Sequence, residues 1–154
     1  MGNRSLLAAF LGLASAALLW FAITSQAPSL GGFSIIAHDG SVVVSDTDVV
    51  SYSPSRHEIL LTSGRADALR AGKYLEGPFT VVVNGVAVME GTFVPPVISR
   101  SYPSDEVVIT YPGFDMEYGA MKIQMGYPWA APGTSDVDDA ELIRYFASTE
   151  RIAP

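Results

Sequence analysis

Alternating apolar and polar positions predict a domain that is rich in β-strands. Short runs of β-branched and aromatic residues, separated by Gly, Pro, Asn and Asp, are typical of strands and turns. Asn84-Gly85 between two of these runs predicts a two-residue hairpin turn, because both residues accept positive φ. Residues 46–54 lack the pattern, and we expect them to be irregular. The expected strands are 33–37, 41–45, 58–62, 79–83, 86–94, 107–111 and 120–125.

Two segments have the spacing of helices. The first follows Ser63, its expected N-cap, and ends at Gly72. The second is predicted over 137–147, because acidic residues in its first turn favour the positive end of the helix dipole. With the strands, these helices predict an α+β fold, an antiparallel-rich sheet with two helices. The expected caps of the second helix are Asp136 or Ser135, and its buried stripe is Leu142, Tyr145 and Phe146.

The longest apolar run lies near the start of the chain. Leu6–Ile23 hold eighteen residues without a charge, and a helix needs about 20 such residues to cross roughly 30 Å of hydrocarbon. We therefore expect an N-terminal single transmembrane helix, with 1–27 as a membrane anchor, 28–32 as a linker and 33–154 as one domain. The residues expected to contact lipid are Leu6, Phe10, Leu13, Leu18, Trp20 and Phe21.

The orientation of this anchor follows from its flanks. Arg4 is the only basic residue before the span, so the N-terminus is expected in the cytoplasm and the domain outside the cell membrane. A cleaved signal peptide is the alternative, and it would release a soluble protein. The best cleavage site, after Ala27, is followed by Pro28, which favours a retained anchor.

Composition narrows the possible functions of the domain. After residue 27 the chain has sixteen carboxylates against eight basic residues, a net charge of −8. Nucleic-acid binding needs a basic surface, so we expect no nucleic-acid partner. Cysteine is absent, which excludes disulfides, thiolate metal sites and cysteine nucleophiles. We expect no cofactor.

His57 is the catalytic candidate, at the entry of an expected strand. Serines are plentiful, but no Gly-x-Ser-x-Gly elbow identifies one as a nucleophile. A histidine here is also typical of an exposed or hydrogen-bonded residue, and His38 is expected in a turn. Two carboxylate pairs offer another route, since glycoside hydrolysis uses two acids. These pairs are Asp105 with Glu106, and Asp115 with Glu117.

Asp46 and Asp48 are the candidate metal ligands. They lie two residues apart in a segment expected to be irregular, where oxygen ligands for a cation often gather. The spacing of an EF-hand loop is missing, so these two carboxylates alone do not predict a metal site.

The aromatic–proline pairs Tyr102-Pro103, Tyr111-Pro112 and Tyr127-Pro128-Trp129, with an aromatic residue between them, supply the candidate partner-binding residues. They are Tyr102, Tyr111, Phe114, Tyr127 and Trp129. Proline interrupts strands, so we expect the tyrosines to gather at strand ends. There they would form an amphipathic contact patch or, alternatively, close the core of the sheet.

The segment from Glu58 to Ile98 resembles a known family. It runs EILLT, a short helix, GPFTVVVNGVAV, and then a second strand ending in PPVI. This order is similar to the periplasmic head region of SecD-type protein-export subunits. The resemblance covers about 40 residues, implies a βαββ unit that binds rather than catalyses, and transfers no functional residue. The apolar span, the acidic domain, the aromatic–proline cluster and the missing catalytic signature favour a single-pass, non-catalytic accessory domain that binds a protein in a membrane complex. An anchored hydrolase is the alternative.

Overall fold

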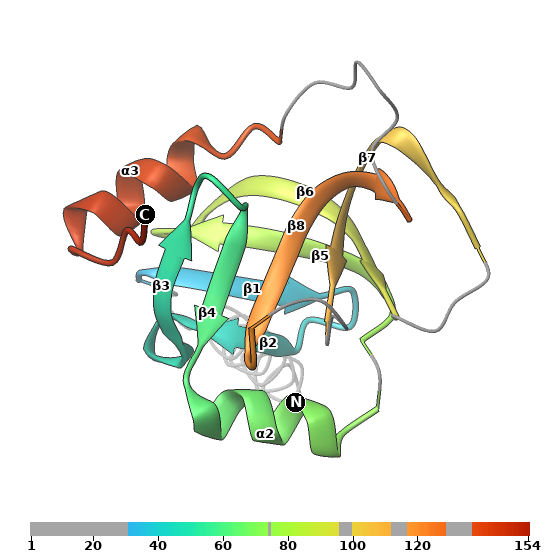
Figure 1. Cartoon of the computed structure of the whole chain (residues 1–154), viewed down its shortest axis with the longest axis horizontal. Helices are drawn as coiled ribbons and strands as arrows, with labels where there is room; N and C mark the ends of the chain where they lie inside the picture. Colours follow the sequence, from blue (N-terminus) through green and yellow to red (C-terminus); the bar gives the residue numbers. More distant parts are fainter. Residues whose placement is uncertain (1–30, 74, 96–99, 112–116, 129–136) are drawn as a thin grey trace, which may run out of the picture.

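Eight strands form one mixed, mostly antiparallel sheet, which curls into a half-barrel accompanied by two helices (Figure 1). The computed structural model describes residues 31–73, 75–95, 100–111, 117–128 and 137–154. The expected α+β fold with an antiparallel-rich sheet is confirmed. The strands are β1 (Phe33–Ala37), β2 (Val42–Ser45), β3 (Val49–Ser53), β4 (Glu58–Leu61), β5 (Gly77–Val83), β6 (Val86–Val94), β7 (Tyr102–Thr110) and β8 (Ala120–Tyr127). The helices are α2 (Ser63–Ala71) and α3 (Ala140–Ser148), and η1 (Asp46–Asp48) is a 3-10 turn.

The strand order explains the curl. The sheet runs β2-β1-β5-β6-β7-β8-β4-β3, and only β6 and β7 pair in parallel. β2 and β3 are therefore the two edges of the sheet, yet only the three residues of η1 join them. Such a short connection requires the two edges to meet at η1, so the sheet bends round on itself.

Side chains and the C-terminal tail cover these edges. Arg65 of α2 donates to the carbonyl oxygens of Val42 and Val43 on β2. The C-terminal tail forms a parallel bridge with β3, between Ile152 and Tyr52. The backbone N–H of Tyr52 donates to the Arg151 carbonyl at 2.9 Å. Covered edges leave fewer free backbone groups for pairing with another chain.

One core lies inside the curl and beneath α3. Phe146 and Leu142 of α3 are fully buried, and the Phe146 ring lies 5.1 Å from Phe33 and 5.6 Å from Tyr52. Two residues of the predicted stripe are thus in the core, and Tyr145 packs at its margin. Other large core side chains include Ile35, Ile59, Phe93, Ile109, Tyr111, Met121 and Ile123.

Two strand predictions need correction. Residues 46–54 are not irregular, because 49–53 form β3, where Ser and Tyr stand in place of the expected apolar run. β7 begins at Tyr102, not 107, and Pro103 lies within it. Proline is tolerated there because the pairing with β8 is irregular between Tyr102 and Val107, and a bulge needs no donor from that residue.

The helix starts also differ from expectation. Thr62, rather than Ser63, is the N-cap of α2, and its side chain accepts from Arg65 N. α3 begins at Ala140, three residues later than predicted, after Asp139. Asp136 and Ser135, the expected caps, lie outside the described residues.

The predicted anchor at 1–27 and most of the linker also lie outside the described residues. Within the described ranges, neither helix has the length and apolarity that a membrane span requires.

Candidate functional site

His57, Asp139 and Tyr52 meet where α3 packs on the β3–β4 turn. The Asp139 carboxylate accepts from the Tyr52 hydroxyl, and its Oδ2 lies 3.1 Å from His57 Nδ1. Tyr52 is fully buried, and Asp139 is only 8% exposed. His57 is partly exposed, so the group reaches from the core to the surface.

The fold sets the position of each group separately. Tyr52 lies on β3 and points into the core, while Asp139 precedes the first turn of α3. His57 ends the tight β3–β4 turn with φ of 51°, and its carbonyl accepts from Ile123 of β8 at 2.9 Å. Non-glycine residues with positive φ are uncommon and persist where the surroundings over-determine them.

The chemistry of this group resembles an acid–base pair. Burial, followed by the hydrogen bond to Asp139, raises the pKa of Tyr52 above its ordinary value, so its hydroxyl stays protonated and donates. When His57 Nδ1–H donates to Asp139, Nε2 is the ring nitrogen left to accept a proton. A serine nucleophile would need to bond to that nitrogen. In the described ranges, no serine hydroxyl forms a hydrogen bond with His57, and Ser53 bonds to Ser55 and to the Pro154 carbonyl.

Sequence reasoning found His57 but not its partners. Tyr52 falls in the segment expected to be irregular, and Asp139 reads as an ordinary acidic helix start. They lie 87 residues apart, and the signal that joins them, a buried carboxylate facing a buried hydroxyl, exists only after folding.

Asp46 is occupied by protein donors. Its carboxylate accepts from the Tyr145 hydroxyl at 2.6 Å and from Arg151 Nη2 at 2.7 Å. Burial alone would raise the pKa of Asp46, but the hydrogen bonds from Tyr145 and Arg151 outweigh it and lower this pKa. Burial and the bond to Asp46 raise the pKa of Tyr145. This network fastens α3 and the C-terminal tail to η1.

Asp48, the other metal candidate, bonds to the end of β2. Its Oδ2 accepts from Ser45 N at 2.8 Å and from Ser45 Oγ at 2.6 Å, and Arg65 Nε lies 3.8 Å away. Among the described residues, no three His, Asp or Glu side chains converge as metal ligands. The two aspartates therefore have a clear structural role in joining the sheet edges.

The aromatic residues lie at different ends of β7. Tyr111 follows the last residue of β7, is buried in the core, and donates to the Ala66 carbonyl of α2 at 3.1 Å. For Tyr111 the structure favours the core interpretation. Tyr102 pairs with Tyr127 at the opposite end, and both are half-buried. Phe114 and Trp129 lie outside the described residues.

The remaining candidates lie apart from the His57 group. His38 is in the β1–β2 turn, as expected, and its N–H donates to the Pro78 carbonyl at 3.0 Å. Asp105 and Glu106 lie on the irregular part of β7, and Glu117 is exposed. Asp115 lies outside the described residues.

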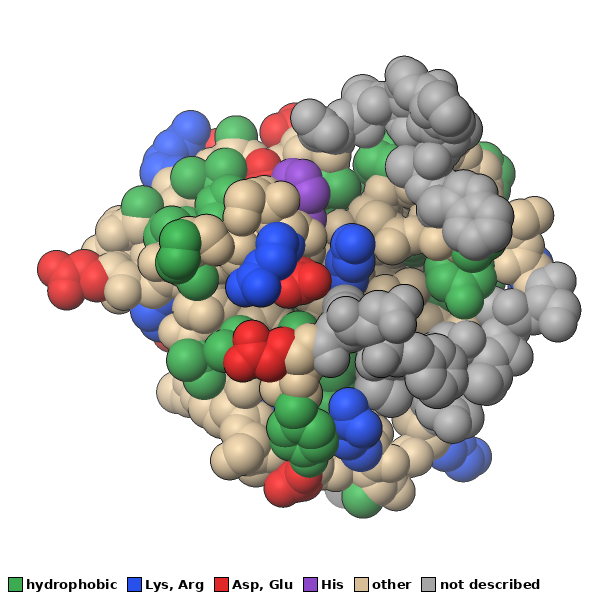
Figure 2. Space-filling model, viewed as in Figure 1, with side chains coloured by type: hydrophobic (Ala, Val, Ile, Leu, Met, Phe, Trp, Pro, Cys, Tyr) green, Lys and Arg blue, Asp and Glu red, His purple; other side chains and the backbone are tan. Residues whose placement is uncertain are grey.

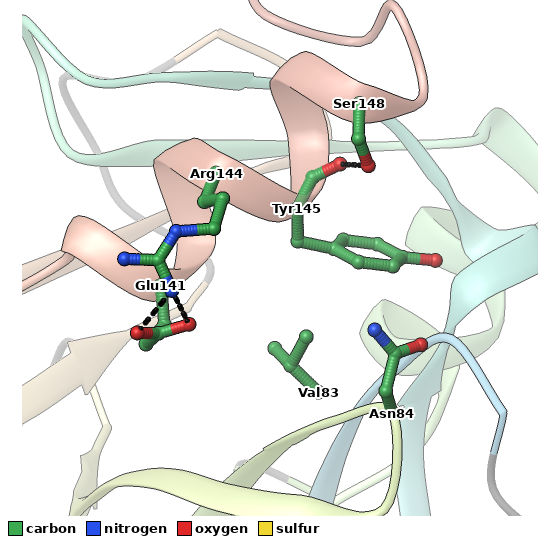
Figure 3. Close-up of a pocket in the computed structure, with 6 residues that line it drawn as sticks. All are labelled: Val83, Asn84, Glu141, Arg144, Tyr145 and Ser148. Carbon is green, nitrogen blue, oxygen red and sulfur yellow. Dashed lines mark hydrogen bonds and ion pairs between the residues drawn. The ribbon is translucent and has the colours of Figure 1, made fainter.

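A shallow pocket of about 220 Å³ lies between α3 and the β5–β6 turn (Figure 3). Arg144 and Glu141 form an ion pair of 2.6 Å at one side of the pocket, and Tyr145 and Asn84 lie at the other.

Basic and acidic side chains lie near one another on the face of the domain shown in Figure 2. The ion pairs of the domain include Arg56 with Glu58 at 3.3 Å.

No protein-family model, curated protein or solved structure matches this chain. The element order β4-α2-β5-β6 is the one that the resemblance to SecD-type subunits implies, but β4 pairs with β3 and β8, away from the β5–β6 hairpin. That resemblance stays a prediction.

Proposed function

We propose that this protein is a single-pass membrane protein whose domain binds a protein partner outside the cell membrane, as an accessory part of a membrane complex. The observation that carries this proposal is the eighteen-residue uncharged run Leu6–Ile23, which nine residues separate from the domain that begins at Phe33. Its length suits a transmembrane helix, and Arg4 suits a cytoplasmic N-terminus. The net charge of −8 favours a soluble domain and a cationic or neutral partner over nucleic acid.

Tyr102 and Tyr127 are the proposed partner-binding residues of the described structure. They pair across the β7–β8 end of the sheet and keep part of their surface in solvent. A tyrosine has an apolar ring and a polar hydroxyl, which is why tyrosine is enriched at protein interfaces. Phe114 and Trp129 are proposed as further partner-binding residues from the sequence alone. Tyr111 is not included, because its side chain is buried in the core.

Site-specific photo-crosslinking tests the proposed surface. A photoreactive phenylalanine analogue replaces Tyr127 in the full chain, in intact membranes. We expect a discrete crosslinked product that disappears when Tyr102→Ser is added. The matched control is the same analogue at Tyr118, which is 51% exposed and lies before β8 rather than at its end. Equal products from both positions would argue against a specific surface.

An anchored hydrolase is the second candidate function. The contact of His57 Nδ1 with the buried Asp139 favours it, because a carboxylate that orients a histidine is part of many acyl-transfer sites. The test is hydrolysis of nitrophenyl esters by the full chain in detergent. Turnover that His57→Gln abolishes, in a folded protein, would support catalysis, and equal turnover by both proteins would refute it.

A further inference from the structure

We infer that the end of the domain where Gly32 enters lies against the outer surface of the lipid bilayer, and that the β7–β8 end points away from it. The inference rests on the proposed membrane anchor. It adds which surface of the domain meets the lipid headgroups and which surface is left for a partner.

The entry point of the chain is fixed to the fold. Gly32 N donates to Asn84 Oδ1 at 3.2 Å, and Asn84 N donates to the Gly32 carbonyl at 2.8 Å. Gly32 is thereby held at the β5–β6 turn, next to the pocket that α3 lines (Figure 3). The tether therefore leaves the domain at one defined place.

The length of the tether limits how the domain can turn. Nine residues, 24–32, follow the apolar run, and they span at most about 30 Å when fully extended. A domain of this size has a radius of gyration of about 14 Å, hence a diameter of about 35 Å. The tether is thus too short to let the far end face the bilayer.

The side chains at the Gly32 end suit a lipid surface. Two ion pairs lie at this end, Arg144 with Glu141 at 2.6 Å and Arg151 with Asp46 at 2.7 Å. Val86, beside the β5–β6 turn, is 63% exposed, more than any other large apolar side chain of the described residues. An ion pair has no net charge, so lipid phosphates repel it less than they repel an unpaired carboxylate. The start of β7 lies at the other end of the long axis from α3 (Figure 1).

Lipid-quenching of single labels tests this orientation. The chain has no cysteine, so Ser148→Cys on α3 and Ser104→Cys on β7 each give one site for a fluorophore. Both serines are exposed, and the substitution is nearly isosteric. Each labelled full-length protein is reconstituted into phosphatidylcholine vesicles that contain a lipid with a nitroxide on its headgroup. We expect several-fold stronger quenching at 148 than at 104.

The outcomes separate this inference from the anchor itself. Equal quenching, or stronger quenching at 104, in protein that floats with vesicles after an alkaline wash would overturn the orientation and leave the anchor intact. Protein that does not float with the vesicles would overturn the anchor and the orientation together. If either variant unfolds, the comparison is repeated with Thr149→Cys in place of Ser148→Cys and Asp105→Cys in place of Ser104→Cys. Both of these residues are exposed.

Discussion

Replacing Asp139 with alanine should destabilise the domain, because it removes the acceptor of a buried hydroxyl. The Tyr52 side chain is fully buried and donates to Asp139. A hydrogen bond to a charged group contributes about 1.5–3 kcal/mol, and an unpaired buried hydroxyl costs about 1–3 kcal/mol. His57 Nδ1, 3.5 Å from the Tyr52 hydroxyl, remains as a substitute acceptor. We therefore expect a loss of about 2–3 kcal/mol in the free energy of unfolding.

A double-mutant cycle assigns this loss to the pair. Tyr52→Phe alone should cost about 1–2 kcal/mol, because Asp139 keeps its contact with His57. The two changes should be non-additive by about 1–2 kcal/mol, since each removes the same hydrogen bond. The assay is thermal unfolding of the full chain in mild detergent, followed by near-ultraviolet circular dichroism. Asp139→Ala should lower Tm by roughly 10 °C.

The control is Asp138→Ala, the exposed neighbour of Asp139. It should change the free energy of unfolding by less than about 0.5 kcal/mol. If Asp139→Ala shifts Tm no more than this control, or if the cycle is additive, then the buried carboxylate does not hold α3 to β3 and the reasoning is refuted.

Four further changes test the packing and the electrostatics. Phe146→Ala should cost about 3–5 kcal/mol in urea unfolding, because it empties the space between α3 and the sheet. Gly91→Ala should greatly reduce the yield of folded protein, because a Cβ there would collide with the Val107 carbonyl of the neighbouring strand. Gly64→Ala, which meets open space on α2, should be neutral or stabilise by up to about 1 kcal/mol. Asp46→Asn should cost about 1 kcal/mol at pH 7, a small value for a carboxylate that is 35% exposed. Because the folded pKa of Asp46 is lowered, the wild-type advantage should be present above about pH 4 and vanish as the pH falls below it.

Local sequence signals predicted much of the fold. The Asn84-Gly85 turn joins β5 and β6 as expected, because both residues adopt positive φ there. β3 was missed because its pattern, VVSYS, mixes serine with apolar residues on an edge strand. The early start of β7 was missed because Pro103 indicates an interruption, which the irregular pairing with β8 accommodates.

The candidate site depended on contacts between distant parts of the chain. His57 stands out by residue type alone, but Asp139 comes beside it only when α3 packs on the β3–β4 turn. Tyr111 and Tyr102 look alike in the sequence, each followed by proline. One ends in the core and the other half-exposed, because nine residues of strand carry them to opposite ends of β7.

The most direct test of the membrane-anchored account is the accessibility of a single cysteine in intact cells that express the full chain. Ser104→Cys presents one thiol on the exposed start of β7. A membrane-impermeant maleimide is added before or after lysis, and the membrane fraction is then analysed. The account predicts full labelling before lysis, on protein that stays with the membranes. Labelling only after lysis, or labelled protein in the soluble fraction, would contradict it.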